Sequence, residues 1–302
     1  MWVGASPDPE PGDGAGLAAS DIVEEASSDQ TNEETETVTS GGLVVTGPEE
    51  FVGSEELAYL EEQVAELEAQ DLDLGIVVLD LETGYSIEYN AEEQLYPASS
   101  VKAAYCTMVC EKYGGASELS WAGELSWAGE ECLINSSNEA YELLRDTYGL
   151  DVFGDWLEGV GATEASEQAR EYGYPDISAG KLAEVWEEIF RYGTSGEDGS
   201  DELVGALSAT NYTALGGLLR DEFEVWAKPG WYPTDEYDLT STNDAGVVFS
   251  DCGPYVIVVM TSMNSDLYGL LPLVDALNAA HGALCGGSTE LLYDETVAIP
   301  GY

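Results

Sequence analysis

The chain has 302 residues, of which 60 are Asp or Glu and only 8 are Lys or Arg, so its formal net charge at pH 7 is −52. Nucleic acid and anionic membrane surfaces recruit basic patches, and a chain this acidic excludes both as partners. Hydrophobic residues make up 44% of the chain, which is enough for a sizeable core in one large domain or two small ones. No stretch reaches the roughly 18 apolar residues of a membrane span.

Residues 1–48 are rich in Asp, Glu, Ser, Thr, Gly and Pro, contain no basic residue and show little hydrophobic periodicity. This composition predicts a disordered acidic linker before a domain at residues 49–302. Such segments often tether secreted domains, so we expect an extracellular or cell-envelope location. We also expect a signal or anchor upstream of this chain, which the full gene would reveal.

Hydrophobic periodicity then predicts a helix and a β-hairpin. Apolar residues recur at helical spacing over residues 54–69, with Ser54 as the N-cap. Residues 74–81 and 85–89 have the β-branched pattern of strands, and Gly84 lies in the turn between them.

The middle of the chain predicts helices and polar connections. Loops are predicted at residues 161–177 and 193–201. An identical hexapeptide occurs twice within residues 118–129, which indicates a duplicated surface connection, although Trp121 and Trp127 could flank a pocket. Helices are expected at 99–112, 139–145, 151–159, 178–192 and, in parts, 203–219.

The last third predicts strands at 222–228, 244–249 and 255–261 and a helix at about 267–281. Two strands at the start and three at the end predict an α+β fold. Its five-stranded antiparallel sheet comes from both termini and is flanked by helices. An all-helical subdomain, at about 114–220, is inserted.

The five cysteines lack metal-ligand spacing, so no metal site is predicted. Cys106 and Cys110 lie one helical turn apart and are expected in the core. A disulfide from one of them to Cys132 remains open in an oxidising compartment. His281, near the end of an apolar helix, is expected to be structural, and no Gly-x-Ser-x-Gly elbow surrounds a serine.

Ser99 and Lys102 place a hydroxyl and an amine three residues apart at the start of a predicted helix, and hence on one face. A neutral lysine can take the proton of a serine nucleophile, and the free N–H groups of a helix start favour negative charge. A lone Ser-x-x-Lys is a weak motif, and its ordinary explanation is a serine at a helix start with a solvated lysine. Only four lysines occur in the chain, and none precedes Lys102, which favours a specific role.

Three motifs in order resemble those of the serine penicillin-recognising enzymes, specifically the class A β-lactamases. Residues 99–102, Ser-Ser-Val-Lys, match Ser-x-x-Lys; residues 136–138, Ser-Ser-Asn, match Ser-Asp-Asn; residues 228–230, Lys-Pro-Gly, match Lys-Thr-Gly. The likeness covers roughly residues 54–283. It implies a β-lactamase/transpeptidase-like fold, with a reduced helical subdomain because the gap between the first two motifs is short.

The resemblance implies a role for each matched residue. Ser99 would be the acylated nucleophile, Lys102 would hold or relay its proton, and Ser136 would protonate the leaving nitrogen. The remaining residues would bind the substrate: Asn138, Lys228, Gly230 and Trp231. Lys228 would attract a substrate carboxylate, and the backbone N–H groups of Ser99 and Trp231 would form the oxyanion hole.

Two departures from the family pattern stand out. Pro229 and Trp231 lack hydroxyls that family members use to hold the substrate carboxylate. The glutamate that activates the deacylating water lies in a Glu-x-x-Leu-Asn sequence, which is missing from residues 161–177. Candidates for that role are Glu164, Glu167 and Glu171, among which spacing does not choose; we expect Glu171 to be the catalytic carboxylate.

The sequence thus predicts a serine hydrolase that acts through a Ser99 acyl-enzyme on a small-molecule or peptide substrate with a carboxylate. Neither metal nor organic cofactor is expected, and the protein is expected to be a monomer. The first hypothesis is β-lactam hydrolysis. The alternatives are a D,D-peptidase or penicillin-binding protein acting on cell-wall peptides, and a catalytically silent binding or surface protein on the same fold.

Overall fold

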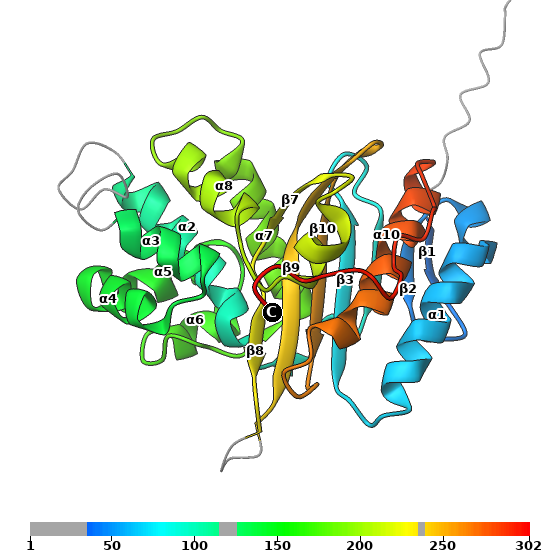
Figure 1. Ribbon diagram of the computed structural model, residues 1–302, viewed down its shortest axis with the longest axis horizontal. Helices are drawn as coiled ribbons and strands as arrows, with labels where there is room; N and C mark the ends of the chain where they lie inside the picture. Colours follow the sequence, from blue (N-terminus) through cyan, green and yellow to red (C-terminus); the bar gives the residue numbers. More distant parts are fainter. Residues whose placement is uncertain (1–34, 115–125, 235–238) are drawn as a thin grey trace, which may run out of the picture. The chain divides into compact units, whose positions relative to one another are not determined.

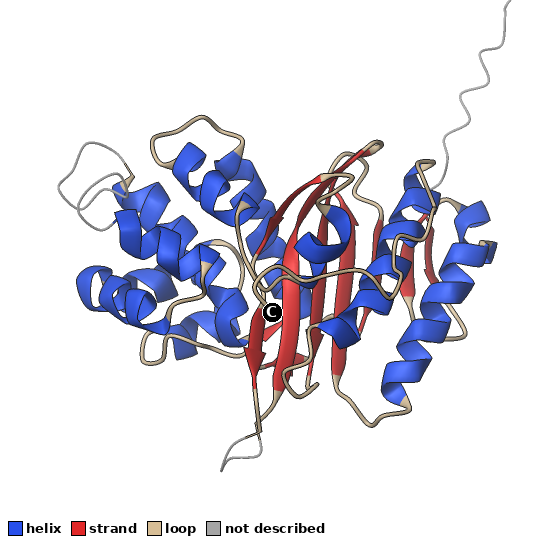
Figure 2. Cartoon of the chain, in the orientation of Figure 1, coloured by secondary structure: helices blue, strands red, loops and turns tan. Residues whose placement is uncertain are grey.

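A computed structural model describes residues 35–114, 126–234 and 239–302. All described elements belong to one unit, Glu33–Tyr302. An antiparallel sheet runs through this unit and has helices on both faces (Figure 1, Figure 2). The predicted α+β fold class is confirmed.

The sheet contains the five predicted strands and three more. Its order is β1-β2-β4-β3-β10-β9-β7, and β8 also pairs with β9. The pair β3–β10 lies in the centre of the sheet, with a further strand on each side. The residues of these two strands are almost all buried, which explains their continuous apolar sequence. The strands are β1 (Thr35–Val38), β2 (Val44–Gly47), β3 (Leu74–Asp80), β4 (Ser86–Tyr89), β7 (Glu224–Ala227), β8 (Gly230–Tyr232), β9 (Ser241–Ser250) and β10 (Gly253–Thr261).

The linker prediction is wrong for residues 35–48, because β1 and β2 form a hairpin within them. Leu43 and Val45 are fully buried, and Val44 pairs with Glu88 of β4. This short apolar run gains its stability from a strand more than 40 residues away, a contact that composition does not reveal. Residues 1–34 lie outside the described residues.

One face of the sheet is covered by α1 (Glu55–Glu68), α9 (Ala214–Leu219) and α10 (Leu271–Cys285). The predicted stripe of α1 is confirmed, since its apolar residues are buried and the Ser54 hydroxyl accepts a hydrogen bond from the Leu57 N–H at 3.1 Å. In Figure 1, α1 and α10 lie side by side at the β1–β2 side of the sheet, in agreement with their close packing.

The other face is covered by α7 (Ala179–Gly193), against which the helical subdomain packs. Figure 1 shows this subdomain as a group of helices on the side of the sheet away from α1 and α10. Its helices are α2 (Lys102–Tyr113), α3 (Ser126–Ile134), α4 (Asn138–Tyr148), α5 (Asp151–Gly159), α6 (Thr163–Ala169) and α8 (Ser200–Ser208).

The prediction that residues 161–177 form only a loop is wrong, because α6 lies within them. Ala165 and Ala169 are buried four residues apart and pack α6 against α5. An apolar stripe made only of alanines is a weak hydrophobic signal, although alanine is the best helix former. The segment ends in β6 (Ile177–Ser178), which pairs with β5 (Gln94–Leu95).

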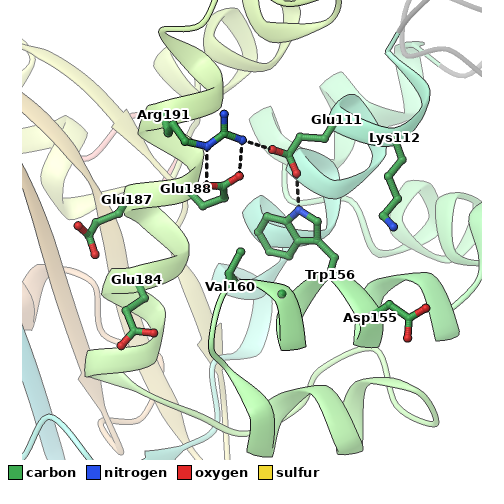
Figure 3. A pocket seen from close by; sticks show the side chains of 10 residues that line it. Glu111, Lys112, Asp155, Trp156, Val160, Glu184, Glu187, Glu188 and Arg191 are labelled. Carbon is green, nitrogen blue, oxygen red and sulfur yellow. Dashed lines mark hydrogen bonds and ion pairs between the residues drawn. The ribbon is translucent and has the colours of Figure 1, made fainter.

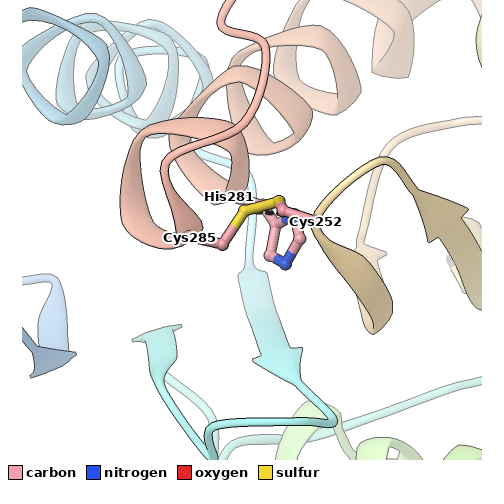
Figure 4. A group of neighbouring side chains, drawn as sticks. All are labelled: Cys252, His281 and Cys285. Carbon is pink, nitrogen blue, oxygen red and sulfur yellow. Dashed lines mark hydrogen bonds between the residues drawn. A yellow bond between two sulfur atoms is a disulfide. The ribbon is translucent and has the colours of Figure 1, made fainter.

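The disulfide joins Cys252 to Cys285, so the alternative that the sequence left open, a disulfide from Cys106 or Cys110 to Cys132, is wrong. Cys106, Cys110 and Cys132 are free and buried. The two bonded cysteines lie 33 residues apart and meet because the β9–β10 turn lies against the end of α10 (Figure 4).

His281 is buried, as expected of a structural residue, and its Nε2 lies 2.9 Å from Asp80 Oδ2. The duplicated hexapeptide falls mostly outside the described residues, Trp121 included, whereas Trp127 is 52% exposed on α3. Among the described helices, none has the length and apolar character needed to cross a bilayer.

Candidate active site

Ser99 lies in η2 (Ala98–Val101), the short 3₁₀ turn that leads directly into α2. Two serines follow one another here, and the structure distinguishes them. The Ser100 hydroxyl is buried and donates to the Pro97 carbonyl at 2.8 Å, whereas Ser99 stays partly exposed and its hydroxyl makes no hydrogen bond to any described residue. Ala98, the residue before Ser99, has a φ of 47°, an uncommon backbone conformation for a residue with a side chain.

Lys102 follows Ser99 by three residues and is fully buried. Its amine donates to the Ser136 carbonyl oxygen at 2.7 Å and to Asn138 Oδ1 at 2.8 Å, and it lies 5.5 Å from the centre of the Tyr141 ring. Burial lowers the pKa of this amine to about 8. A lysine with such a pKa is partly neutral near physiological pH and can accept a proton.

The second motif covers the turn between α3 and α4 and the first residue of α4, and its three residues differ in their conformations and contacts. Ser136 adopts a φ of 56°, Ser137 caps α4 by accepting a hydrogen bond from the Ala140 N–H, and Asn138 faces Lys102. Ser and Asp are equally good N-caps. The replacement of the motif's middle Asp by Ser137 therefore keeps the helix start intact.

Lys228 approaches the same turn from the sheet side. It is fully buried, and its amine donates to the Ser136 hydroxyl at 2.9 Å and to the Pro229 carbonyl at 3.0 Å. Burial, followed by the nearby positive charge of Lys102, lowers the pKa of Lys228 to about 7. Ser136 thus links two buried amines, one through its carbonyl and the other through its hydroxyl.

Gly230 brings the start of β8 against the Ser99 turn. A Cβ atom at this position would lie 2.3 Å from the Pro97 oxygen, 2.5 Å from the Ser100 nitrogen and 2.7 Å from the Ser99 nitrogen. Only glycine fits this approach. The next residue, Trp231, pairs with Thr242 of β9 and is only partly buried, so its backbone is held near the Ser99 turn by the sheet.

Asn243 fixes the relative position of the sheet and the Ser99 turn. Its side-chain amide donates to the Tyr96 carbonyl at 2.9 Å, and its oxygen accepts from the Thr261 N–H at 3.0 Å. The side chain is buried and lies opposite Gly230 in the β8–β9 register. The strand that carries Gly230 and the turn that carries Ser99 are therefore held together by a satisfied polar group.

A family model described as the β-lactamase enzyme family matches residues 124–280, which is 157 of the 302 residues. The chain belongs to this family. The matched range includes Ser136, Asn138 and Lys228, whereas Ser99 and Lys102 precede it. No curated protein sequence matches the chain.

Solved β-lactamases have the same fold as this member of the family. The structure from Streptosporangium roseum is 15% identical, covers 76% of this chain and 100% of its own, and has a TM-score of 0.60. The structure from Sphaerobacter thermophilus is 16% identical, covers 74% and 96%, and has a TM-score of 0.59. The TLA-3 extended-spectrum β-lactamase is 15% identical, covers 74% and 97%, and also has a TM-score of 0.59.

The structure does not bring Glu171 to this cluster. Glu164, Glu167 and Glu171 are all exposed, and no hydrogen bond among the described residues links them to Ser99, the two lysines or Ser136. The group from residues 161–177 that reaches the site is the Tyr174 hydroxyl, which donates to Asn138 Oδ1 at 3.3 Å.

Sequence reasoning missed Tyr174 and the aromatic wall to which it belongs. Tyr174 packs edge-on against Tyr141, and the Arg145 guanidinium lies 4.7 Å from the Tyr141 ring centre. Burial raises the pKa of Tyr174 to about 12, so the hydroxyl keeps its proton and acts as a donor. The two tyrosines lie 33 positions apart in the sequence, so only the Tyr-x-Tyr at residues 172–174 could have drawn notice.

A cavity of about 720 Å³ lies away from this cluster, over α2, α5 and α7. Figure 3 shows Arg191 between Glu111 and Glu188, and the Trp156 indole donating to Glu111. Burial, followed by a hydrogen bond to Glu188, raises the pKa of Glu111 to about 7. Among the described residues that line this cavity there is no serine, threonine or cysteine, so they supply no hydroxyl or thiol nucleophile.

Proposed function

We propose that this protein is a serine hydrolase that forms an acyl-enzyme on Ser99 and opens the amide of β-lactams. One observation carries the proposal: two buried lysines with lowered pKa values meet at Ser136, and one of them follows by a single helical turn the Ser99 hydroxyl, which has no hydrogen-bond partner among the described residues. Membership of the β-lactamase family and the shared fold support it.

Acylation would begin with transfer of the Ser99 proton to the neutral amine of Lys102 as the serine oxygen attacks the amide carbonyl. The negative charge on the tetrahedral carbonyl oxygen would be met by the backbone N–H groups of Ser99 and Trp231. As the C–N bond breaks, the leaving nitrogen would take a proton from the Ser136 hydroxyl, which Lys228 reprotonates at 2.9 Å.

Substrate binding would use the positive charge of Lys228 when it is protonated. Among the described residues, neither this amine nor that of Lys102 forms an ion pair with a carboxylate. An anionic substrate would therefore not have to displace an internal partner. Pro229 and Trp231 supply no side-chain hydroxyl for the same carboxylate, so we expect weak ground-state binding of ordinary penicillins.

A second candidate, a penicillin-binding D,D-peptidase, is favoured by the position of the acidic residues. Deacylation in class A enzymes uses a carboxylate to activate water. Here the corresponding segment presents Tyr174 to Asn138, while its three glutamates are exposed. A tyrosine that keeps its proton is a poor general base, so we expect the acyl-enzyme to persist.

Intact-protein mass spectrometry tests both candidates. The protein is incubated with a penicillin and, separately, with a chromogenic cephalosporin, while adduct mass and hydrolysed drug are followed over hours. A lasting adduct supports the peptidase-like candidate, and turnover with an unmodified mass supports a β-lactamase. If neither an adduct nor turnover is observed, the result favours a catalytically silent protein on this fold.

The neighbouring serines supply a matched pair of variants. Ser99→Ala should abolish the adduct, whereas Ser100→Ala should keep it, because the Ser100 hydroxyl is already bonded to the Pro97 carbonyl. An adduct that survives in Ser99→Ala would refute the proposed nucleophile.

A further inference from the structure

Three side chains of metal-binding type converge at the β9–β10 turn. Cys252 lies in the turn, and His281 and Cys285 lie one helical turn apart on α10 (Figure 4). Their ligand atoms all lie within 4.8 Å of one another. In the oxidised chain the two sulfur atoms are bonded to each other in the disulfide, so neither is a thiolate that could bind a metal ion.

His281 is oriented as metal-binding histidines usually are. Its Nε2 lies 2.9 Å from Asp80 Oδ2, and a buried carboxylate at that distance accepts the Nε2 proton. The other ring nitrogen, Nδ1, then carries the lone pair and faces the Cys285 sulfur at 3.8 Å. The Tyr255 ring stacks on the imidazole, with 3.8 Å between ring centres, and holds this orientation.

Asp80 is itself held in place. Its Oδ1 accepts hydrogen bonds from the backbone N–H and the hydroxyl of Thr83, both at 2.8 Å. A carboxylate that is fixed in this way and hydrogen-bonded to a ligating histidine sets the tautomer of the ring and raises its basicity.

We propose that, when the disulfide is reduced, Cys252, Cys285 and His281 bind one thiophilic divalent cation such as Zn²⁺. Two thiolates and one imidazole form a common zinc ligand set, and a fourth ligand completes the tetrahedral coordination. A cavity of about 10 Å³, lined in part by Asp251, adjoins two of the three ligands, Cys252 and His281. Such a space is roughly that of one water molecule, which would serve as the fourth ligand.

The site and the disulfide exclude each other. A dithiol reductant supplies two electrons and two protons: the Cys252–Cys285 bond breaks, two protein thiols form, and the reductant becomes a disulfide. Binding of the cation then releases both thiol protons. Reoxidation by the disulfide form of such a reagent takes two electrons from the two thiolates, reforms the Cys252–Cys285 bond and expels the ion, while the reagent takes up two protons from solvent and becomes a dithiol again.

The proposal is independent of the proposed function, because this site lies at the opposite end of β9 from the active site. Asn243, which contacts the Ser99 turn, and Ser250, at the β9–β10 turn, are seven residues apart on one strand. At about 3.3 Å per residue they are separated by roughly 23 Å. Loss of Ser99 labelling and loss of metal binding can thus be measured separately.

Cobalt titration tests the proposal. The full chain is reduced with a dithiol, exchanged anaerobically into metal-free buffer and titrated with Co²⁺. We expect one Co²⁺ per reduced chain, with thiolate-to-metal charge-transfer absorption and the strong ligand-field bands of a tetrahedral site. Zn²⁺ should remove both signals, and the oxidised chain should give neither.

Variants identify the ligands. Cys252→Ala and Cys285→Ala should each abolish the charge-transfer absorption, and Cys110→Ala, which removes a buried free thiol of α2, should leave the stoichiometry at one. The oxidised wild-type chain is a negative control that needs no substitution. Absence of Co²⁺ binding to the reduced chain, or equal binding in Cys252→Ala, would overturn the proposal and leave the disulfide with a structural role alone.

Discussion

The substitution Gly230→Ala probes the contact between β8 and the Ser99 turn, where we propose the oxyanion hole. The new Cβ atom would meet backbone atoms at 2.3, 2.5 and 2.7 Å, and real Cβ atoms essentially never come closer than 3.0 Å to another heavy atom. All three atoms belong to the backbone, so no side chain can move aside, and we expect η2 and β8 to separate by about 1 Å. A displacement of this size misplaces the reacting groups and lowers the rate on the order of 10²-fold.

The assay is the rate of Ser99 labelling by a penicillin, measured by intact mass together with the melting temperature. We expect labelling to fall roughly 10²-fold, with an overpacking cost of about 1–3 kcal/mol in the free energy of unfolding. Gly205→Ala is the matched control, since this exposed glycine of α8 has open space around it, and alanine should stabilise the helix by about 0.5–1 kcal/mol. Wild-type labelling and stability in Gly230→Ala would refute the reasoning.

Three further predictions concern the two lysines of the site, Glu111 and Ser137. Because Lys102 must be neutral to accept the Ser99 proton and Lys228 must be protonated to reprotonate Ser136, the labelling rate should pass through a broad maximum between the two pKa values, about 7 for Lys228 and about 8 for Lys102, and fall about tenfold per unit on either side; a flat profile from pH 5 to 9 would contradict this. The pKa of Glu111 is raised in the fold from 4.5 to about 7, so the folded state holds the proton more tightly and the free energy of unfolding should decrease as pH rises across that interval. Denaturant titrations at several pH values measure this decrease, which should be larger in wild type than in Glu111→Gln by on the order of 1–2 kcal/mol over the whole interval. Parallel plots of the free energy of unfolding against pH would show that Glu111 does not titrate there. Finally, Ser137→Ala should cost about 1 kcal/mol of stability through loss of the α4 cap and leave labelling near the wild-type rate; a large loss of labelling at unchanged stability would place Ser137 in the chemistry.

The residues that could be predicted from sequence are those whose local pattern already decides the structure. Ser54 caps α1, Gly84 takes a φ of 76° in its turn, and the apolar runs of β3 and β10 are buried. The three motifs could also be placed, because each occupies the start of a helix, a tight turn or the end of a strand, where short sequences have strong preferences.

What the sequence did not reveal depends on partners distant in the chain. β2 is stable because β4 pairs with it, and the disulfide exists because the β9–β10 turn packs against the end of α10. Tyr174 reaches Asn138 only after α6 has packed on α5. Glu171 follows α6, a helix that the sequence does not predict, and spacing alone does not show that Glu171 faces solvent.

The two lysine amines of the site have no ionic partner among the described residues, although the chain carries a net charge of −52. An anion approaching from solution meets a repulsive field before it reaches them. Dissolved salt screens the exposed carboxylates over about 8 Å at physiological strength, and it screens buried charges much less. Raising the salt concentration should therefore speed the association of anionic ligands, the reverse of what a positively charged surface would give, so salt would act on this protein as a regulator of access.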